Sequence, residues 1–348
     1  MNHGTSTTAA TLAAALLATF GCAARAQTYT FTDLGSLGSY SFGFAINAQG
    51  RVAGFSGTND GESWSPTLWR RDRPVDLGPD AYNCQARALS RREVVVGHCT
   101  PVGGGDQHAV RWWAGTVTEL AGAPSGAYGI NDHDAAVGAS YLPALGATHA
   151  MLWIGDQATD LGTLRGGTYS AAYDINGAGK VVGESMNSQG VMHATLWQNA
   201  RARDLGTLGG RDSSATAINN AGLVVGYSRT VRNRVRAALW EGRKVIDLGS
   251  LAGDQSYAWD INNLGVVVGS SYVPGHPHER NSRAVVWIDR KIIDLNTLLD
   301  DATRTTWVLR SASGINDAGQ ITGEAKNTGT GRTHAYRLDP PATAASRP

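Results

Sequence analysis

The sequence predicts an all-β fold, a seven-bladed β-propeller of four-stranded antiparallel blades that is closed by an N-terminal strand completing blade seven. Two observations lead to this prediction. A segment of about 43 residues repeats along the chain, and the array of repeats begins with a lone strand and ends one strand short. One four-stranded sheet cannot bury both of its faces alone, so successive copies must pack face to face.

Seven copies of the repeat can be aligned. Each is built from DLGTLGG, a stretch of small residues, A-x-I-N-x-x-G, VVG-x-S, a variable loop and HA-x-LW. The acid that precedes the first Leu recurs at Asp33, Asp76, Glu119, Asp160, Asp204, Asp247 and Asp294. The Trp recurs at Trp69, Trp112, Trp153, Trp197, Trp240 and Trp287, and Leu338 takes its position in the last copy.

Each copy predicts four short strands. ATAINNAGLVVGYS at 215–228 is typical of two strands joined by a four-residue turn, because Asn closes an Asx-turn and Gly accepts positive φ. RAALW and KVIDLG supply the third and fourth strands. TYTFTDLG at 28–35 is a fourth strand without its hairpin, and the last copy ends with a third strand, HAYRLD at 334–339. We therefore expect these two segments to pair and close the ring.

The first 26 residues predict a signal peptide. An apolar run from Ala9 to Phe20 precedes Ala24-Arg25-Ala26, which fits a small-x-small cleavage site near Ala26. A lipid anchor at Cys22 is a minor alternative. No later apolar stretch reaches the length of about 18 residues that a membrane span needs, so no transmembrane segment is expected. The protein is predicted to be secreted or periplasmic.

Residues 27–340 are then assigned to the propeller, and residues 341–348, rich in Pro, Ala and Ser, are expected to be a disordered tail. The net charge of +1 gives no reason to expect nucleic acid as a partner. No P-loop and no GxGxxG between a strand and a helix occurs, so no cofactor is assigned.

Cys84 and Cys99 allow three hypotheses: zinc ligands, a redox pair or a structural disulfide. Zinc would need about four ligands at close spacing, and a redox dithiol is usually Cys-x-x-Cys. In five other copies a Ser pair is symmetric about the turn: Ser41 and Ser56, Ser125 and Ser140, Ser170 and Ser185, Ser213 and Ser228, Ser256 and Ser271. Cys84 and Cys99 occupy those two positions in the second copy, where paired antiparallel residues are close enough for a disulfide.

The repeated segments resemble the bacterial HAF-repeat family, described as probable extracellular repeat proteins. Its His-Ala-aromatic signature is present in degraded form as HAV, HAM, HAT and HAY, starting at His108, His149, His193 and His334. The resemblance covers nearly all of the mature chain. It implies secretion and this architecture, and it carries no established activity.

The repeated polar residues are interpreted as structural. Equivalent positions on neighbouring blades are about 10 Å or more apart, so the four His cannot share one metal, and no metal ligand is assigned. A hydrogen bond to a neighbouring loop or to the acid of DLG is the better explanation for them. Asp174 and Asp260, each two residues before a turn Asn, are a weak candidate for acid–base chemistry.

The loops that follow the second strand share almost no sequence, and variable loops on a fixed scaffold often bind ligands. With the blade connections they form the predicted ligand face. The residues proposed to bind there are Arg229, Arg232, Arg234, His276, His278, Arg280, Tyr272, Tyr169, Tyr257 and Trp259. The alternatives are a solvated basic rim and aromatic packing between blades.

The sequence therefore predicts a secreted, non-catalytic binding or interaction module for an acidic glycan or a protein. No catalytic residue is assigned. A polysaccharide-acting enzyme, either a lyase or a glycosidase, and a cell-envelope scaffold are the alternatives, because a fold does not determine a function.

Overall fold

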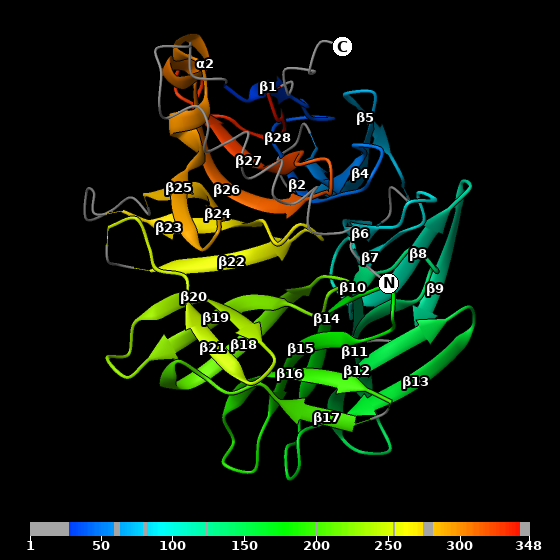
Figure 1. The fold of residues 1–348 in the computed structure, drawn as a ribbon. Coiled ribbons are helices and arrows are strands. Elements are labelled where there is room, and N and C mark those ends of the chain that lie inside the picture. Colours follow the sequence, from blue (N-terminus) through cyan, green and yellow to red (C-terminus); the bar gives the residue numbers. More distant parts are fainter. Residues whose placement is uncertain are drawn as a thin grey trace, which may run out of the picture.

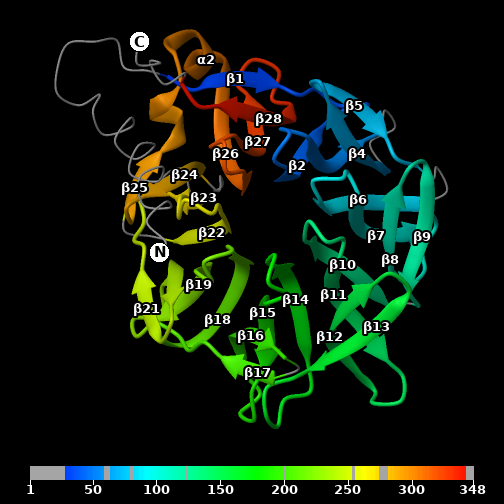
Figure 2. The ribbon, with the colours of Figure 1, turned by 45° about the vertical axis from the view of Figure 1, so that its right-hand side comes forward.

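The computed structural model describes residues 28–58, 63–78, 82–122, 124–199, 201–252, 255–273 and 281–341. Within these residues, seven four-stranded antiparallel sheets form a ring (Figure 1). Figure 2 shows the ring around its axis, with the strand before each hairpin turn of the type Ile-Asn nearest the centre. The predicted seven-bladed β-propeller is confirmed.

Blades one to four follow one another along the chain. Blade one contains β2 (Ser41–Ile46), β3 (Val52–Gly57), β4 (Trp64–Arg70) and β5 (Arg73–Asp76). Blade two contains β6 (Tyr82–Leu89), β7 (Val95–Pro101), β8 (His108–Trp113) and β9 (Thr116–Ala121). Blade three contains β10 (Ser125–Ile130), β11 (Ala136–Leu142), β12 (Ala147–Ile154) and β13 (Gln157–Gly162). Blade four contains β14 (Ser170–Ile175), β15 (Val181–Met186), β16 (Met192–Gln198) and β17 (Arg201–Asp204).

The remaining blades complete the ring. Blade five contains β18 (Gly209–Ile218), β19 (Val224–Thr230), β20 (Val235–Glu241) and β21 (Lys244–Asp247). Blade six contains β22 (Ser256–Ile261), β23 (Val267–Tyr272), β24 (Ser282–Ile288) and β25 (Lys291–Asp294). Blade seven contains β26 (Trp307–Ile315), β27 (Ile321–Asn327), β28 (Thr333–Asp339) and, as its outer strand, β1 (Thr30–Asp33).

The closing pair joins the two ends of the array as predicted. β1 runs antiparallel to β28, with Phe31 opposite Leu338. The Phe31 ring packs 5.4 Å from that of Trp307 and 6.1 Å from that of Tyr336, measured between centroids. Because β1 covers the outer edge of β28, the row of backbone groups on that edge is hydrogen-bonded instead of exposed.

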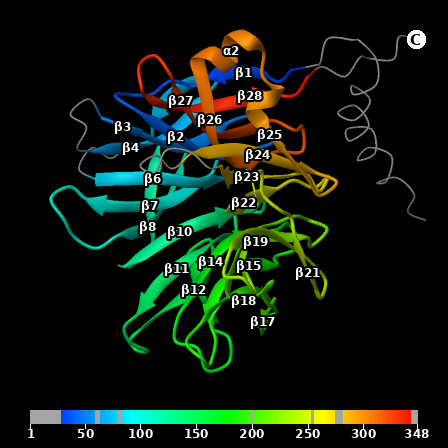
Figure 3. The ribbon, with the colours of Figure 1, turned by 90° about the vertical axis from the view of Figure 1, so that its left-hand side faces the viewer.

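An insertion between blades six and seven was not predicted from the repeat. It folds as the 3₁₀ helix η2 (Leu295–Leu298) and the short helix α2 (Asp301–Thr306), which lie beside the closing blade (Figure 3). The backbone N–H of Tyr29 donates to the carbonyl of Leu298 over 2.9 Å. The predicted signal peptide and residues 342–348 of the predicted tail lie outside the described residues.

A ring of side-chain amides links the blades at the end of the axis where the Ile-Asn turns lie. Asn219 shows the pattern: its Oδ1 accepts from the N–H of Leu223, which holds the turn, and its Nδ2 donates to the carbonyl of Asn262 in the next blade over 3.1 Å. Six Asn donate to the next blade in this way: Asn47, Asn131, Asn176, Asn219, Asn262 and Asn316. Asn316 donates to the carbonyl of Asn47, and this bond closes the ring.

A second set of bonds joins the blades farther along the inner strands. The inner Ser of each of five blades accepts from the N–H of an Ala on the third strand of the preceding blade, as Ser213 accepts from Ala194 over 2.9 Å. The other bonds of this kind end on Ser41, Ser125, Ser170 and Ser256. Each therefore fixes the spacing of two neighbouring sheets.

The repeated His residues bond to the acids of DLG, which is one of the two kinds of partner predicted for them. His193 Nδ1 lies 2.7 Å from Asp204, and His334 Nδ1 lies 2.9 Å from Asp33 across the closing pair. The hydrogen bond to Asp204 raises the pKa of His193. These His residues connect the third strand of a blade to its own fourth strand, which explains why they repeat.

The Cys84–Cys99 disulfide is present, and the two residues are directly paired across β6 and β7 with a Cα–Cα distance of 4.1 Å. Both are buried. The blade before them carries Pro66 where other blades carry the Ala that donates its N–H to the inner Ser. Proline has no N–H, so the seam between blades one and two, where Pro66 and Cys84 replace that Ala and Ser, requires no acceptor at position 84.

We expect Asn219→Asp to lower the free energy of unfolding at pH 7 by at least about 2 kcal/mol, because a carboxylate oxygen would then face the carbonyl of Asn262 without a donor. Chemical denaturation measures the change. Asn220→Asp is the matched control: its Oδ1 only accepts from the N–H of Gly177, so the same substitution should change stability by less than about 0.5 kcal/mol. Equal stability of Asn219→Asp and the wild type would contradict the role of the ring.

We expect the Cys84→Ser, Cys99→Ser variant to fold with a loss of up to about 3 kcal/mol. Adding Pro66→Ala should recover about 1 kcal/mol, because the new N–H can donate to Ser at position 84. The same Pro66→Ala change in a Cys84→Ala, Cys99→Ala background provides no acceptor and should recover nothing. A double-mutant cycle from denaturation curves tests this, and equal effects in both backgrounds would refute the coupling.

Candidate functional site

Each of the seven inner strands carries a β-bulge three residues before the turn position that Asn occupies in six blades. In blade five, Ala215 pairs with Gly226 and Ala217 with Val225, so Thr216 has no partner. The same shift leaves unpaired Phe44, Arg87, Tyr128, Tyr173, Thr216, Trp259 and Ser313. A bulge re-aims a side chain, and here all seven face one cavity on the axis.

The glycine of VVG is what permits the bulge. A Cβ placed on Gly226 would lie 2.1 Å from the carbonyl oxygen of Ser214 on the facing strand, far inside van der Waals contact. Gly183 shows the same approach, at 2.0 Å from the carbonyl oxygen of Ala171. The repeated glycine is therefore required by the close backbone contact that accompanies each bulge.

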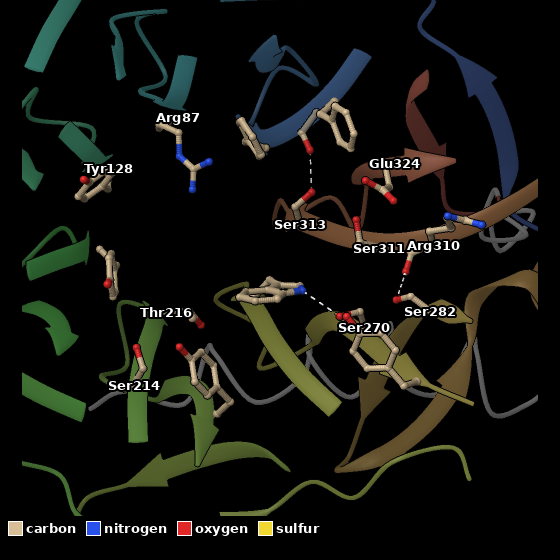
Figure 4. Close-up of a pocket in the computed structure, with 17 residues that line it drawn as sticks. Arg87, Tyr128, Ser214, Thr216, Ser270, Ser282, Arg310, Ser311, Ser313 and Glu324 are labelled. Atoms are coloured by element: carbon tan, nitrogen blue, oxygen red, sulfur yellow. Dashed lines mark hydrogen bonds between the residues drawn. The ribbon is translucent and has the colours of Figure 1, made fainter. Parts of the chain in front are cut away.

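The cavity has a volume of about 690 Å³. Arg87 and Tyr128 lie on one side of it, and Arg310 and Glu324 lie on the opposite side (Figure 4). Ser214 and Thr216 of β18 and Ser311 and Ser313 of β26 add hydroxyl groups to the lining, together with aromatic rings from several blades. The walls thus combine flat apolar faces, small hydroxyls and charged groups.

Arg87 has no acidic partner among the described residues. Its guanidinium lies over the ring of Phe44, with Cζ 4.1 Å from the ring centroid, and its buried Nε has no hydrogen-bond partner. His98 is close by, and its pKa is lowered to about 4 by burial and then by the charge of Arg87. This imidazole is therefore neutral at physiological pH and leaves the guanidinium as the charge on that wall.

The aromatic residues form two groups. Tyr128 and Tyr173 pack with centroids 5.8 Å apart, and the Tyr173 hydroxyl donates to Glu184 over 2.8 Å. On the far side, Tyr257 stacks on Trp259 with centroids 5.5 Å apart and an interplanar angle of 3°. The Nε1 of Trp259 donates to the Ser270 hydroxyl over 3.1 Å, so the indole has a fixed orientation at the cavity wall.

Glu324 lines the cavity next to Arg310. Burial raises the pKa of the Glu324 carboxyl, and the positive charge of Arg310 partly offsets that shift. Ser282 donates to the carbonyl of Arg310 over 2.8 Å, which anchors the backbone beside this pair.

Asp174 and Asp260 connect blades and do not line the cavity. Asp174 accepts from the N–H groups of Ile175 and Ile218, and Asp260 accepts from the corresponding groups of blades six and seven. Burial raises the pKa of Asp174 to about 6. Burial, and to a smaller extent the charge of Asp174, raise the pKa of Asp260 to about 7.

The residues proposed from the sequence fall into three groups. Trp259 and Tyr272 line the cavity, and Tyr257 stacks on Trp259. Tyr169 is half-buried, and burial raises the pKa of its hydroxyl. Arg229 forms an ion pair with Asp212 at 2.8 Å, and Arg232 and Arg234 lie in the exposed loop after β19. His276, His278 and Arg280 lie outside the described residues, so the proposed basic rim stays a prediction.

Sequence analysis missed the other cavity residues, although a signal was present. In the strand that repeats approximately as A-x-x-I-N, the first x varies among Phe, Arg, Tyr, Tyr, Thr, Trp and Ser, while the residue before it is always Ala or Gly and the residue two places after it is always Ile or Leu. The predicted ligand face was assigned to the variable loops and blade connections and not to this strand. Among the described residues, no group of three or more His, Cys, Asp or Glu could hold a metal ion.

The fold and cavity define a seven-bladed β-propeller with a lined central channel. A family model described as "Protein of unknown function (DUF3466)" matches residues 211–339, which contain most of blades five to seven. No curated protein matches the chain. Within the described part of the chain, no helix is long and apolar enough to cross a bilayer.

Several solved structures share the architecture at low identity. The β-propeller domain of the Trilobed protease from Pyrococcus furiosus is 8% identical, with a TM-score of 0.56, and the match covers 91% of this chain and 95% of that domain. TolB from Acinetobacter baumannii is 11% identical, with a TM-score of 0.47 and coverage of 83% and 63%, so this chain spans less than two thirds of TolB. These similarities concern the fold alone. The Pyrococcus domain is described as having an open velcro topology, whereas β1 and β28 close this ring.

The raised pKa values of Asp174 and Asp260 predict a pH dependence of stability. Between about pH 4 and pH 7 the folded protein holds protons that the unfolded chain has released, so the free energy of unfolding should fall as the pH rises through this window. In Asp260→Asn this slope should become shallower, whatever the absolute loss of stability. Urea denaturation from pH 4 to pH 8 measures both slopes, and identical slopes would show that Asp260 does not titrate in this range.

Proposed function

We propose that this protein is an exported, non-catalytic binding module whose ligand site is the cavity on the propeller axis. The observation that carries the proposal is that all seven bulged side chains, the variable position of an otherwise repeated strand, line one cavity of about 690 Å³. Small-molecule sites commonly enclose about 300 to 1,000 Å³. Because Trp259, Tyr128 and Tyr173 offer apolar ring faces among hydroxyl groups, the ligand class that fits these walls best is carbohydrate.

Binding is a better explanation than hydrolysis for the charges in the cavity. Glycoside hydrolysis usually needs two carboxyl groups that flank the scissile bond, and Glu324 is the single carboxylate among the described residues that line the cavity. Asp174 and Asp260 each accept two backbone N–H groups between blades.

Three observations support export as part of the proposal. Residues 1–26 have the sequence pattern of a signal peptide, and the repeats resemble an extracellular family. The Cys84–Cys99 disulfide is compatible with an extracellular or periplasmic location, because such bonds persist in oxidising compartments.

A large side chain introduced into the cavity should weaken binding. The mature wild-type chain, screened on a glycan array and then titrated by tryptophan fluorescence with the best ligand, should bind, and Thr216→Trp should bind at least about tenfold more weakly, a loss of about 1.4 kcal/mol. Val231→Trp is the matched control, since it places the same indole at a side chain that is 80% exposed. Retained binding in Thr216→Trp, or equal loss in the control, would place the site elsewhere.

The same ligand also distinguishes a binding module from an enzyme. Chromatography of the polysaccharide after incubation with the wild type should show no shorter or unsaturated products. Products that disappear in Glu324→Gln would establish a polysaccharide-acting enzyme instead.

A further inference from the structure

We infer that the cavity recognises the carboxylate of an acidic sugar through Arg87, with the sugar ring against the neighbouring aromatic side chains. This inference rests on the proposed function and names the ligand class of the same site. It assigns the anion-binding role to a half-buried bulge residue in blade two and not to the exposed rim of blades five and six.

The unpaired guanidinium is the first observation. Arg87 is half-buried, its Nε has no hydrogen-bond partner, and no ion pair joins it to a carboxylate among the described residues. Removing a charge from water without a partner is costly, and an Arg in a protein interior is normally paired. A ligand anion at this wall would supply the missing partner.

The residues around Arg87 orient its guanidinium and leave its N–H edge available to such a ligand. The ring of Phe44 supports one face of the guanidinium, and Tyr128 follows it around the axis (Figure 4). The ring centroid of His98 lies 6.2 Å from that of Tyr128. This imidazole is neutral at physiological pH, so Arg87 is the charged group on this wall. A guanidinium that stacks on one ring still presents the N–H donors of its edge, which match the two oxygens of a carboxylate.

The rest of the cavity matches a sugar better than a bare anion. Tyr128 and Tyr173 offer ring faces beside Arg87, and Thr216 and Ser313 place hydroxyl groups on the same bulge layer. Glu324, on the opposite side, can accept hydrogen bonds from sugar hydroxyls. Arg310 lies near Glu324, and the charge of Arg310 partly offsets the rise in the Glu324 pKa, so a carboxylate is already close to Arg310 whereas none of the described residues pairs one with Arg87.

The test compares two ligands that differ only at one carbon: methyl α-D-galactopyranosiduronate, which carries a carboxylate, and methyl α-D-galactopyranoside, which carries a neutral CH₂OH. Titration of the mature chain followed by NMR should give at least about tenfold tighter binding of the uronate, equivalent to about 1.4 kcal/mol. Arg87→Gln should remove this preference, while Arg87→Lys should keep part of it. Arg232→Gln, which neutralises an Arg of the exposed rim, is the matched control and should leave both affinities unchanged.

Three outcomes would overturn the inference: equal affinity for the two ligands, a preference that survives in Arg87→Gln, or loss of the preference in Arg232→Gln. Competition with inorganic phosphate adds a fourth outcome. If phosphate displaces the uronate at a phosphate concentration below that of the uronate, the cavity is a phosphate site instead. If neither galactoside binds, but a neutral glycan binds the wild type and not Thr216→Trp, then the inference of an acidic sugar is wrong while the binding function stands. If no ligand depends on position 216, the proposed function fails as well.

Discussion

The hydrogen bond from a turn Asn to the next blade is the constraint on which the rest of this structure depends. Each of these Asn residues holds its own turn through Oδ1 and its neighbour through Nδ2, so local and long-range order come from one side chain. The bulge lies three residues before the turn position in each of the seven blades. Because the amide ring places the turns at one height, it also places the bulged residues in one layer around the axis.

Blade two departs from this pattern and shows how strongly it is maintained. Ser90 replaces the Asn, and its hydroxyl donates to Asp134 of blade three over 2.9 Å instead of to a backbone carbonyl. Glu93 stands where most blades have Gly, with a φ of 59°, and Arg51 and Arg70 of blade one both contact its carboxylate. Side-chain bonds across both seams therefore replace the missing amide and stabilise the strained turn. This is also the blade that carries the disulfide and Arg87.

The sequence and the structure agree where the information is periodic. The repeat predicted the number of blades, the closing pair and the role of the His residues, and the symmetry of the Ser pairs predicted the partner of Cys84. The cavity was not predicted, because a bulge is a shift of register between two strands, and a hairpin pattern alone does not show it. The variation at the Arg87 position pointed to a site only once all seven positions were known to share one layer. The insertion at 295–306 follows no repeat, so periodicity gave no information about it.

The seam between Pro66 and Cys84 imposes an order on the substitutions that could have produced it from the common repeat. A change of the inner Ser to Cys while residue 66 was still Ala would remove the acceptor of a buried N–H, at a cost of about 1 to 3 kcal/mol. A change of Ala to Pro first removes the donor, and the later loss of the hydroxyl then leaves no backbone group unpaired. The same logic runs in reverse, so once the bridge has formed, reversion of the proline alone is penalised. In this seam the absence of one N–H hydrogen makes one order of the two substitutions less costly than the other.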